Sequence, residues 1–516
     1  MKNTHWIILI IHFILIGFLS IIGLLFRDVV FVYLLILIPG LIFANFEYLF
    51  KRNYSYFLFL KDQLLKYFII LIFFLGFIIY CICPRYISKE KAVEDIEFMK
   101  KTLENIHPDI YYAIPKDSFL IAYNQLISDL PERLSENDFY KICARLTSHF
   151  HTGHTRPMSN LSLSRMQFIF NRLFPYQTKI LDNRLFITSS LSIFHTIPVG
   201  SEIIEINGKN INLLISEWSQ LVSYENIAFR NYLITKPLNI GIWNDFKEYN
   251  IKYKEYGSNI IKQKIVQGDL FTNLYSLLIQ RYEKPEKLIF KEISPKIGYI
   301  GFFSCMDLKN YKAFYKTAFR ELRKKGIHNL IIDIRGNEGG HTEIGAELMQ
   351  YIFHQPFKET DSAQVKVSEE LIATGKVERK LGVDKKVAGK TYTKVNVSYQ
   401  LNENPLRFNG QTYLLTDNGT FSAGQVFASA FRCYGNGTII GEETGGVTVS
   451  FGDVHIFDLP NSGLQIMTSW EKVFCVCGLD NRTGVIPDYN VIHTVKDFTI
   501  NRDKILEFAV NLILKK

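Results

Sequence analysis

Two glycine-rich strand ends, each leading into a helix, constrain the fold of the C-terminal half more than any other feature. "IIDIRGNEGGH" (Ile331 to His341) is an apolar strand that ends in a tight turn, and "LLTDNGTFSAGQVFASAF" (Leu414 to Phe431) repeats the pattern. Glycine enters such turns without a Cβ penalty. Strands and helices alternate from Leu288 onward, so we expect an α/β layer with an at least partly parallel sheet.

The same block shows where its helices and its interruption lie. Helical patterns cover 310–325 and 343–353, and a polar stretch from Lys358 to about Pro405 separates the two glycine-rich strand ends. We expect this stretch to be an insertion or a mobile flap.

Two further blocks precede the α/β layer. Apolar residues recur at helical spacing from Val93 to Ile106, where His107-Pro108 ends the run, and Ser135 with Asp138 marks a second helix start. This predicts a small helical cap. Short strands follow between 173 and 265, and Asn207-Gly208 predicts a tight turn. The second block is therefore expected to be β-rich.

Three apolar runs open the chain, at 5–26, 29–46 and 64–83. Each is near the ~20 residues that a helix needs to cross a bilayer, so we predict three transmembrane helices. Lysine and arginine in the loop after the second run place that loop in the cytoplasm. The predicted localisation is therefore integral to a bacterial inner membrane, with everything after Pro84 extracytoplasmic, either periplasmic or extracellular.

Charge and cysteine content exclude some functions. The formal net charge of +9 among 516 residues includes no run of five or more basic residues, so nucleic acid is not an expected partner. The five cysteines beyond residue 90 show no repeated metal-type spacing, and both disulfides and free core thiols are open to them.

Ser422, within the second glycine-rich stretch, has two interpretations. A serine at a helix start is a good cap, but it also lies near free backbone N–H groups that stabilise a negative tetrahedral intermediate. The residues around it, 419–424, lack the GxSxG elbow, which disfavours an α/β-hydrolase. The turn at 331–341 is not a phosphate loop, and its amides are either structural or an oxyanion site.

The run "TSHFHTGHTRP" (147–157) contains His149, His151 and His154. Histidine is the usual proton acceptor for a serine, and a cluster of this spacing is also able to bind zinc. The metal interpretation resembles the metallo-β-lactamase motif, but Gly153 stands where that motif has aspartate. Base, metal ligand and no chemistry all stay open on the residues alone.

These features, taken in order, resemble the tail-specific (C-terminal processing) serine peptidase family, serine peptidase family forty-one, and its tricorn-like branch. The resemblance covers about 91 to the C-terminus and rests on "gHT", "DxRgNxGG", "TxxxFSAGQ", "GeeTGG" and a final "GVxPD" at 484–488. It implies a PDZ-like module and an α/β (crotonase-like) catalytic domain. The predicted domains are the anchor (1–85), the cap (86–165), the PDZ-like module (170–270) and the catalytic domain (285–516).

The resemblance also implies roles for individual residues. Ser422 would be the nucleophile, with His154 as its base and His149 in reserve. The oxyanion hole would use the amides of Ala423 and of Gly339 or Gly340. Some members use a lysine base, but no lysine lies between Ser422 and Lys472, so a Ser-His arrangement is expected.

One part of the family pattern is missing. Tricorn-like enzymes have a glutamate three residues before the "GVxPD" glycine, where this chain has Asn481, preceded by Asp480. Either residue could orient the histidine, as the third group of a triad does. Glu442 and Glu443 are further candidates, although the resemblance makes "GeeTGG" a structural turn.

The sequence thus predicts a membrane-anchored serine endopeptidase that needs no metal or cofactor and hydrolyses peptide bonds of extracytoplasmic peptides or unfolded proteins. One alternative is a weakly active or inactive peptide-binding protein of the same fold. A second is a zinc hydrolase that uses His149, His151 and His154.

Overall fold

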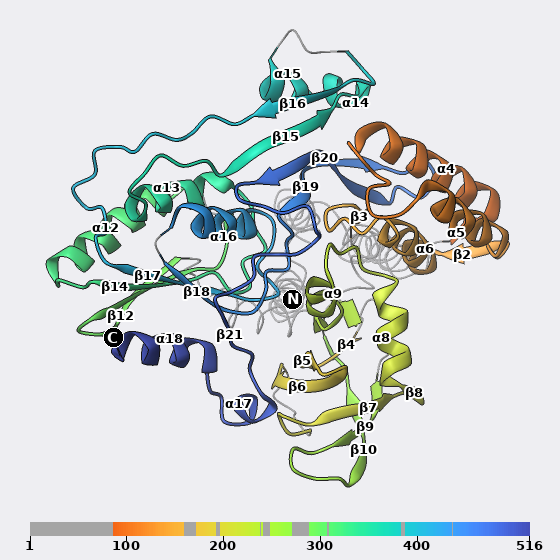
Figure 1. Cartoon of the computed structure of the whole chain (residues 1–516). Helices are drawn as coiled ribbons and strands as arrows, with labels where there is room; N and C mark the ends of the chain where they lie inside the picture. Colours follow the sequence, from red (N-terminus) through yellow and green to blue (C-terminus); the bar gives the residue numbers. More distant parts are fainter. Residues whose placement is uncertain are drawn as a thin grey trace, which may run out of the picture. The chain divides into compact units, whose positions relative to one another are not determined.

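The structure is a computed structural model, and Figure 1 shows how its elements are arranged. It describes residues 86–158, 172–191, 197–237, 239–240, 248–270, 288–306, 309–382, 387–435 and 437–515. All of these residues belong to one compact unit, Pro84–Lys516.

The C-terminal half is built on a six-stranded sheet with the order β12-β13-β14-β17-β18-β21. Neighbouring strands from β13 to β21 are parallel, and the edge strand β12 is antiparallel to β13. The expected partly parallel sheet is therefore confirmed. Its strands are β12 (Leu288–Ser294), β13 (Ile297–Phe302), β14 (Asn329–Asp333), β17 (Gln411–Thr416), β18 (Thr438–Gly441) and β21 (Tyr489–Asn490).

Helices cover both faces of this sheet. Because side chains alternate along a strand, Ile300 and Ile332 pack toward one set of helices, whereas Tyr299 and Ile331 pack toward α18. Helices α12 and α13 match the predicted helices at 310–325 and 343–353. The helices are α12 (Tyr311–Lys324), α13 (Thr342–Ile352) and α16 (Ala423–Tyr434) on the first face and α18 (Lys504–Leu514) on the second.

A second sheet has the order β16-β15-β20-β19, and the short strand β3 (Arg156–Pro157) also pairs with β20. Its main strands are β15 (Thr360–Lys366), β16 (Thr391–Val395), β19 (Val449–Asp458) and β20 (Gln465–Cys475). The stretch that the sequence presented as an insertion or flap thus contributes β15 and β16. Pairing with β20 buries Ala363 and Val365, which ties this stretch to the sheet.

The helical cap contains α4 (Lys89–Ile106), α5 (Lys116–Ser128) and α6 (Glu136–Ser148). Helix α4 ends at the residue before His107, as the sequence predicted. Helix α6 begins after Ser135, whose hydroxyl accepts the Asp138 amide at 3.1 Å. Both local signals are therefore confirmed. Two short strands, β1 (Tyr86–Ser88) and β2 (Arg133–Ser135), pair beside these helices.

The β-rich module contains the sheet β10-β9-β7-β6-β5, with β8 paired to β7. Asn207 and Gly208 have φ of 50° and 80°, which confirms the predicted tight turn. The module's elements are β5 (Tyr176–Leu181), β6 (Arg184–Ser190), β7 (Glu202–Ile206), β8 (Lys209–Asn210), β9 (Glu248–Lys254), β10 (Ile261–Gln267), α8 (Ile211–Ser219) and α9 (Ile227–Ile234). Nearby are β4 (Arg172–Leu173), β11 (Asp269–Leu270) and α17 (Val495–Thr499).

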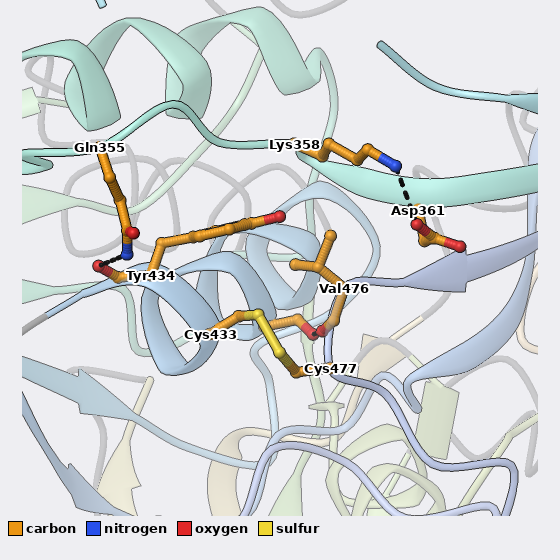
Figure 2. The surroundings of a disulfide bond; sticks show 8 residues. Gln355, Lys358, Asp361, Cys433, Tyr434, Val476 and Cys477 are labelled. Atoms are coloured by element: carbon orange, nitrogen blue, oxygen red, sulfur yellow. Dashed lines mark hydrogen bonds and ion pairs between the residues drawn. A yellow bond between two sulfur atoms is a disulfide. The ribbon is translucent and has the colours of Figure 1, made fainter. Parts of the chain in front are cut away.

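A disulfide joins Cys433, near the end of α16, to Cys477, which follows β20 (Figure 2). Cys143, Cys305 and Cys475 are buried free thiols, so both outcomes that the sequence left open occur. The two bridged residues are 44 positions apart. The bridge ties the helix that begins beside Ser422 to the segment that continues toward residues 480 and 481.

The predicted membrane anchor requires a correction. The three apolar runs at 5–26, 29–46 and 64–83 lie outside the described residues. Within the part of the chain that the structure describes, no helix is both long and apolar enough to cross a bilayer. The structure therefore supports a mixed α/β fold, and it gives no support to the three transmembrane helices of the predicted fold class or to the predicted integral-membrane localisation.

We expect the disulfide between Cys433 and Cys477 to contribute stability. The chain-entropy model gives about 4 kcal/mol for a loop of this length, and measured values are typically about 2–4 kcal/mol. Reduction should therefore lower the free energy of unfolding by that amount in urea titrations. Cys433→Ser is the control, since its stability should not respond to reductant. An unchanged wild-type midpoint after verified reduction would contradict the prediction.

Candidate active site

Ser422 occupies the N-cap position of α16, but its side chain does not cap the helix. It makes no capping hydrogen bond, and its backbone has φ of 51° and ψ of −123°. Positive φ is uncommon for a residue other than glycine and costs of order 1–3 kcal/mol, which surrounding structure must offset. The serine side chain is therefore held away from the helix amides.

The Ser422 hydroxyl faces His154 instead. The distance from Ser422 Oγ to His154 Nε2 is 3.2 Å, across 268 positions of sequence. His154 lies in the turn between α6 and β3, and β3 pairs with β20 through Ile466. The neighbouring Thr155 is buried, and its carbonyl accepts a hydrogen bond from the Ser223 hydroxyl at 2.6 Å. The pairing of β3 with β20 and the hydrogen bond from Ser223 hold the turn, and this places His154 of the cap beside Ser422.

An aromatic stack sets the plane of the His154 ring. The ring stacks on Phe421 at 4.8 Å, and Phe421 stacks on Phe229 of α9 at 4.2 Å. A Cβ at Gly153 would lie 2.6 Å from the Phe421 ring. A side chain at position 153 would therefore require Phe421 to move.

The environment of His154 keeps its imidazole neutral. Burial lowers the pKa of His154 to about 4, and the nearby charge of Arg156 acts in the same direction. The backbone of Phe451 and the charge of Asp453 oppose this shift in pKa. At neutral pH the ring is unprotonated, as a proton acceptor must be.

The hydrogen bond to Ser422 comes from His154 and not from the other two histidines of the run. His149 is the C-cap of α6, and His151 packs edge-on against Tyr224 with ring centroids 4.8 Å apart. Across the described ranges, no three His, Cys, Asp or Glu side chains are grouped so that they could hold a metal ion. The zinc alternative therefore has no ligand set in the described part of the chain.

The hydrogen bonds around Ser422 distinguish between the amides of Gly339 and Gly340, the two candidates for the second oxyanion donor. A Cβ at Gly339 would lie 2.7 Å from the Ser422 Cβ and 2.8 Å from the Ala423 nitrogen, so the two glycine-rich turns meet here. The Gly339 amide donates to Asn337 Oδ1 at 3.0 Å. The amides of Ala423 and Gly340 donate no hydrogen bond within the described residues. This favours Gly340 over Gly339 as the second donor.

The structure does not bring the four acidic or amide candidates to His154. Asp480 accepts from the Tyr112 hydroxyl, and Asn481 Oδ1 accepts from the Thr483 amide at 3.1 Å. Their exposed positions leave them no contact with the histidine, whose Nδ1 is buried without a hydrogen-bond partner in the described structure. Glu442 pairs with Lys179. Glu443 accepts the Gly484 amide at 2.7 Å.

Glu225, a carboxylate near the site, belongs to none of the sequence motifs. It is 4% exposed, and its Oε2 accepts the Val447 amide at 3.2 Å. Burial raises the pKa of Glu225 to about 7. No motif surrounds it, and the only local signal is Asn226, the N-cap of α9, which follows it directly.

Comparison with known proteins now identifies the family. Residues 296–491 match the model of peptidase family S41. This segment belongs to family S41. The family predicted from the motifs is therefore confirmed, and with it the assignment to the serine-type peptidases, which are hydrolases.

One sequence relative is the carboxy-terminal processing protease CtpB of Bacillus subtilis (strain 168). It is 26% identical over 173 residues, which cover 33% of this chain and 30% of CtpB. The match thus spans less than a third of the relative's length.

Solved structures resemble the chain over a larger part. Mature CPAF complexed with lactacystin has a TM-score of 0.59 at 13% identity, and the match covers 82% of this chain and 97% of that one. A CPAF mutant gives a TM-score of 0.61 at 12% identity, with 82% and 96% covered. At such identities the likeness shows a common fold that extends beyond the segment matched by the family model.

We expect buried histidines to make the protein less stable in acid. Burial lowers the pKa of His107 to about 3 and those of His151 and His154 to about 4, from 6.5. Each therefore contributes stability that is complete above pH 6.5 and is lost as the pH falls toward 4, because the unfolded chain binds the proton more tightly. Glu225 opposes this trend, because burial raises its pKa to about 7 and the folded protein therefore binds its one proton more tightly than the unfolded chain does.

The measurement is the free energy of unfolding between pH 7 and pH 4.5. His107→Gln should reduce its pH slope by about one proton, or about 1.4 kcal/mol per pH unit where the folded and unfolded forms differ most. A slope that His107→Gln leaves unchanged would exclude His107 as a source.

Proposed function

We propose that the chain is a serine endopeptidase that hydrolyses peptide bonds in peptides or unfolded proteins through an acyl-enzyme. The observation that carries this function is the 3.2 Å approach of His154 Nε2 to the hydroxyl of Ser422, which is held at positive φ and does not cap its helix. Membership of residues 296–491 in family S41 supports it.

In the proposed reaction, Ser422 Oγ attacks the scissile carbonyl carbon while its proton passes to His154 Nε2. The amides of Ala423 and Gly340 would donate to the oxyanion, beside the N-terminus of α16. The intermediate collapses, the C–N bond breaks, and the leaving amine takes the proton from His154. Water then attacks the acyl carbon while His154 Nε2 accepts its proton. The bond from this carbon to Ser422 Oγ breaks, Oγ takes the proton from His154, and the acid leaves.

We further propose that the β-rich module, PDZ-like by resemblance, receives a segment of the substrate as an added strand. Strand β10 is at one edge of the module's sheet, and Ile261 and Ile265 on it are exposed. Among the described strands, β10 pairs only with β9, and an edge of this kind with apolar side chains suits an extended peptide. The second candidate function is a protein of the same fold that binds peptides without cleaving them. The observation in its favour is Asn481, which stands where the family pattern has glutamate.

A fluorophosphonate probe should label Ser422 covalently in the wild type and not in Ser422→Ala. The reason is that such probes require an activated serine, whereas an unactivated hydroxyl is a poor nucleophile. Labelling is read by mass spectrometry of the modified peptide, together with cleavage of an unfolded protein. Ser429→Ala, on the same helix, is the control, and Ser422 should still be labelled in this variant. Absence of both label and cleavage in the wild type would favour the binding protein.

Alanine substitutions of the two histidines should have different effects. His154→Ala should lower the labelling rate by about 10³-fold or more, because it removes the proton acceptor. His149→Ala should stay within about threefold of the wild type, since its ring makes no contact with Ser422. Rates of label incorporation measure both. Near-normal labelling of His154→Ala would show that another group is the base.

A further inference from the structure

Several buried polar atoms near the candidate site make no hydrogen bond within the described structure. They include His151 Nδ1 and Thr152 Oγ1, and the two that concern the reaction, His154 Nδ1 and Glu225 Oε1. Buried polar atoms are normally paired, so each requires an explanation. When His154 Nε2 accepts the serine proton, Nδ1 carries a hydrogen, whereas a carboxylate oxygen is an acceptor. The two atoms are therefore chemically complementary.

Glu225 and His154 also share the same neighbours. The Glu225 carboxylate accepts the Val447 amide at 3.2 Å. The amides of Gly153 and Phe451 also interact with it and lower its pKa against the effect of burial. Gly153 directly precedes His154, and the backbone of Phe451 interacts with the His154 ring and raises its pKa. The carboxylate thus interacts with the backbone of the residue before His154 and of a residue that also interacts with the His154 ring.

Arg482 connects this pair to the segment where the family glutamate is missing. It directly follows Asn481, and its Nη2 donates to the Glu225 carbonyl at 2.9 Å and lies 3.4 Å from the His151 carbonyl, which also accepts from it. Its positive charge lowers the pKa of Glu225. In the tricorn-like pattern this segment carries the glutamate, whereas in this chain it carries Arg482. The positive charge of Arg482 lies near Glu225, an acid of the β-rich module.

We propose that Glu225 is the positioning residue for His154, in place of the acid that position 481 lacks. This inference rests on the proposed function. Glu225 would hold the backbone at Gly153 and Phe451 and stabilise the imidazolium that forms when Ser422 gives up its proton. Asp453 is less suited to this role, because its side chain is 45% exposed and pairs with Lys380.

The first test is the rate of Ser422 labelling by a fluorophosphonate in the full chain. Glu225→Gln, which keeps the shape and removes the charge, should lower the rate on the order of 10²-fold. Added to His154→Ala, the same change should cause no further loss, because the two residues act as a unit. Equal losses in both backgrounds would indicate a merely structural carboxylate and overturn the proposal.

Glu443→Gln is the matched control. Glu443 also accepts a loop amide, that of Gly484, and it lies in the neighbouring "GEETGG" turn. Its labelling rate should stay within about threefold of the wild type. A loss as large as that of Glu225→Gln would show that any disturbance of these loops slows the serine.

The pH profile gives a second reading. Labelling of the wild type should rise through pH about 7, where Glu225 ionises, and this limb should be absent from Glu225→Gln. The charged or titratable groups that also act here are Arg156 and Asp453 at His154, and Arg482 and Cys475 at Glu225. Persistence of the limb in Glu225→Gln would assign it to another of these groups and contradict the proposal.

A measurement independent of activity separates this proposal from the proposed function. Nitrogen NMR of the full chain with labelled histidine, recorded at pH 8 where Glu225 is charged, should show the hydrogen of the His154 ring on Nδ1 in the wild type and a shifted Nδ1 signal in Glu225→Gln, because the charged carboxylate favours this tautomer. A wild type that a fluorophosphonate does not label would refute the peptidase, while a shifted Nδ1 signal in Glu225→Gln would still support the Glu225 contact. The same Nδ1 signal in both proteins would overturn the proposal.

Discussion

The buried side chain of Asn337 joins the two glycine-rich turns on which the site depends. It is fully buried, its Nδ2 donates to the Phe302 carbonyl at 2.9 Å, and its Oδ1 accepts the Gly339 amide at 3.0 Å. Its own carbonyl accepts the Phe421 amide at 2.9 Å. One residue therefore ties the turn after β14 to the residue before Ser422. Because these are buried hydrogen bonds, losing one would leave an unpaired polar group in the core.

The site is completed by parts of the chain that fold as other elements. The cap contributes His154, and α9 contributes Phe229, whose ring holds Phe421 against the histidine. The same helix reaches the turn before Gly339 through Tyr232, whose hydroxyl donates to Glu338 at 2.7 Å. The β-rich module thus contacts both the turn that carries Ser422 and the turn that carries Gly339 and Gly340. A change in the packing of α9 would therefore move Phe421 and, with it, the backbone next to Ser422.

Local signals predicted much of the fold. The start of α6 at Ser135, the end of α4 before His107 and the turn at Asn207-Gly208 each depend on neighbouring residues, and each occurs as predicted. The stretch around β15 was harder, because it is polar and its pairing partner β20 lies about a hundred positions later. Its alternation of buried Ala363 and Val365 is too short to stand out in the sequence.

The sequence by itself determined the strand-turn-helix at Ser422, the histidines upstream, the family, and the absence of an acid at Asn481. These are properties of short segments, which the chain encodes locally. Only the tertiary structure decided that His154 rather than His149 meets the serine, that the Gly339 amide is already engaged, and that Glu225 is buried nearby. These contacts depend on residues that are far apart in the chain, 268 positions in the case of His154 and Ser422. They follow from the packing of whole elements, which no local pattern records.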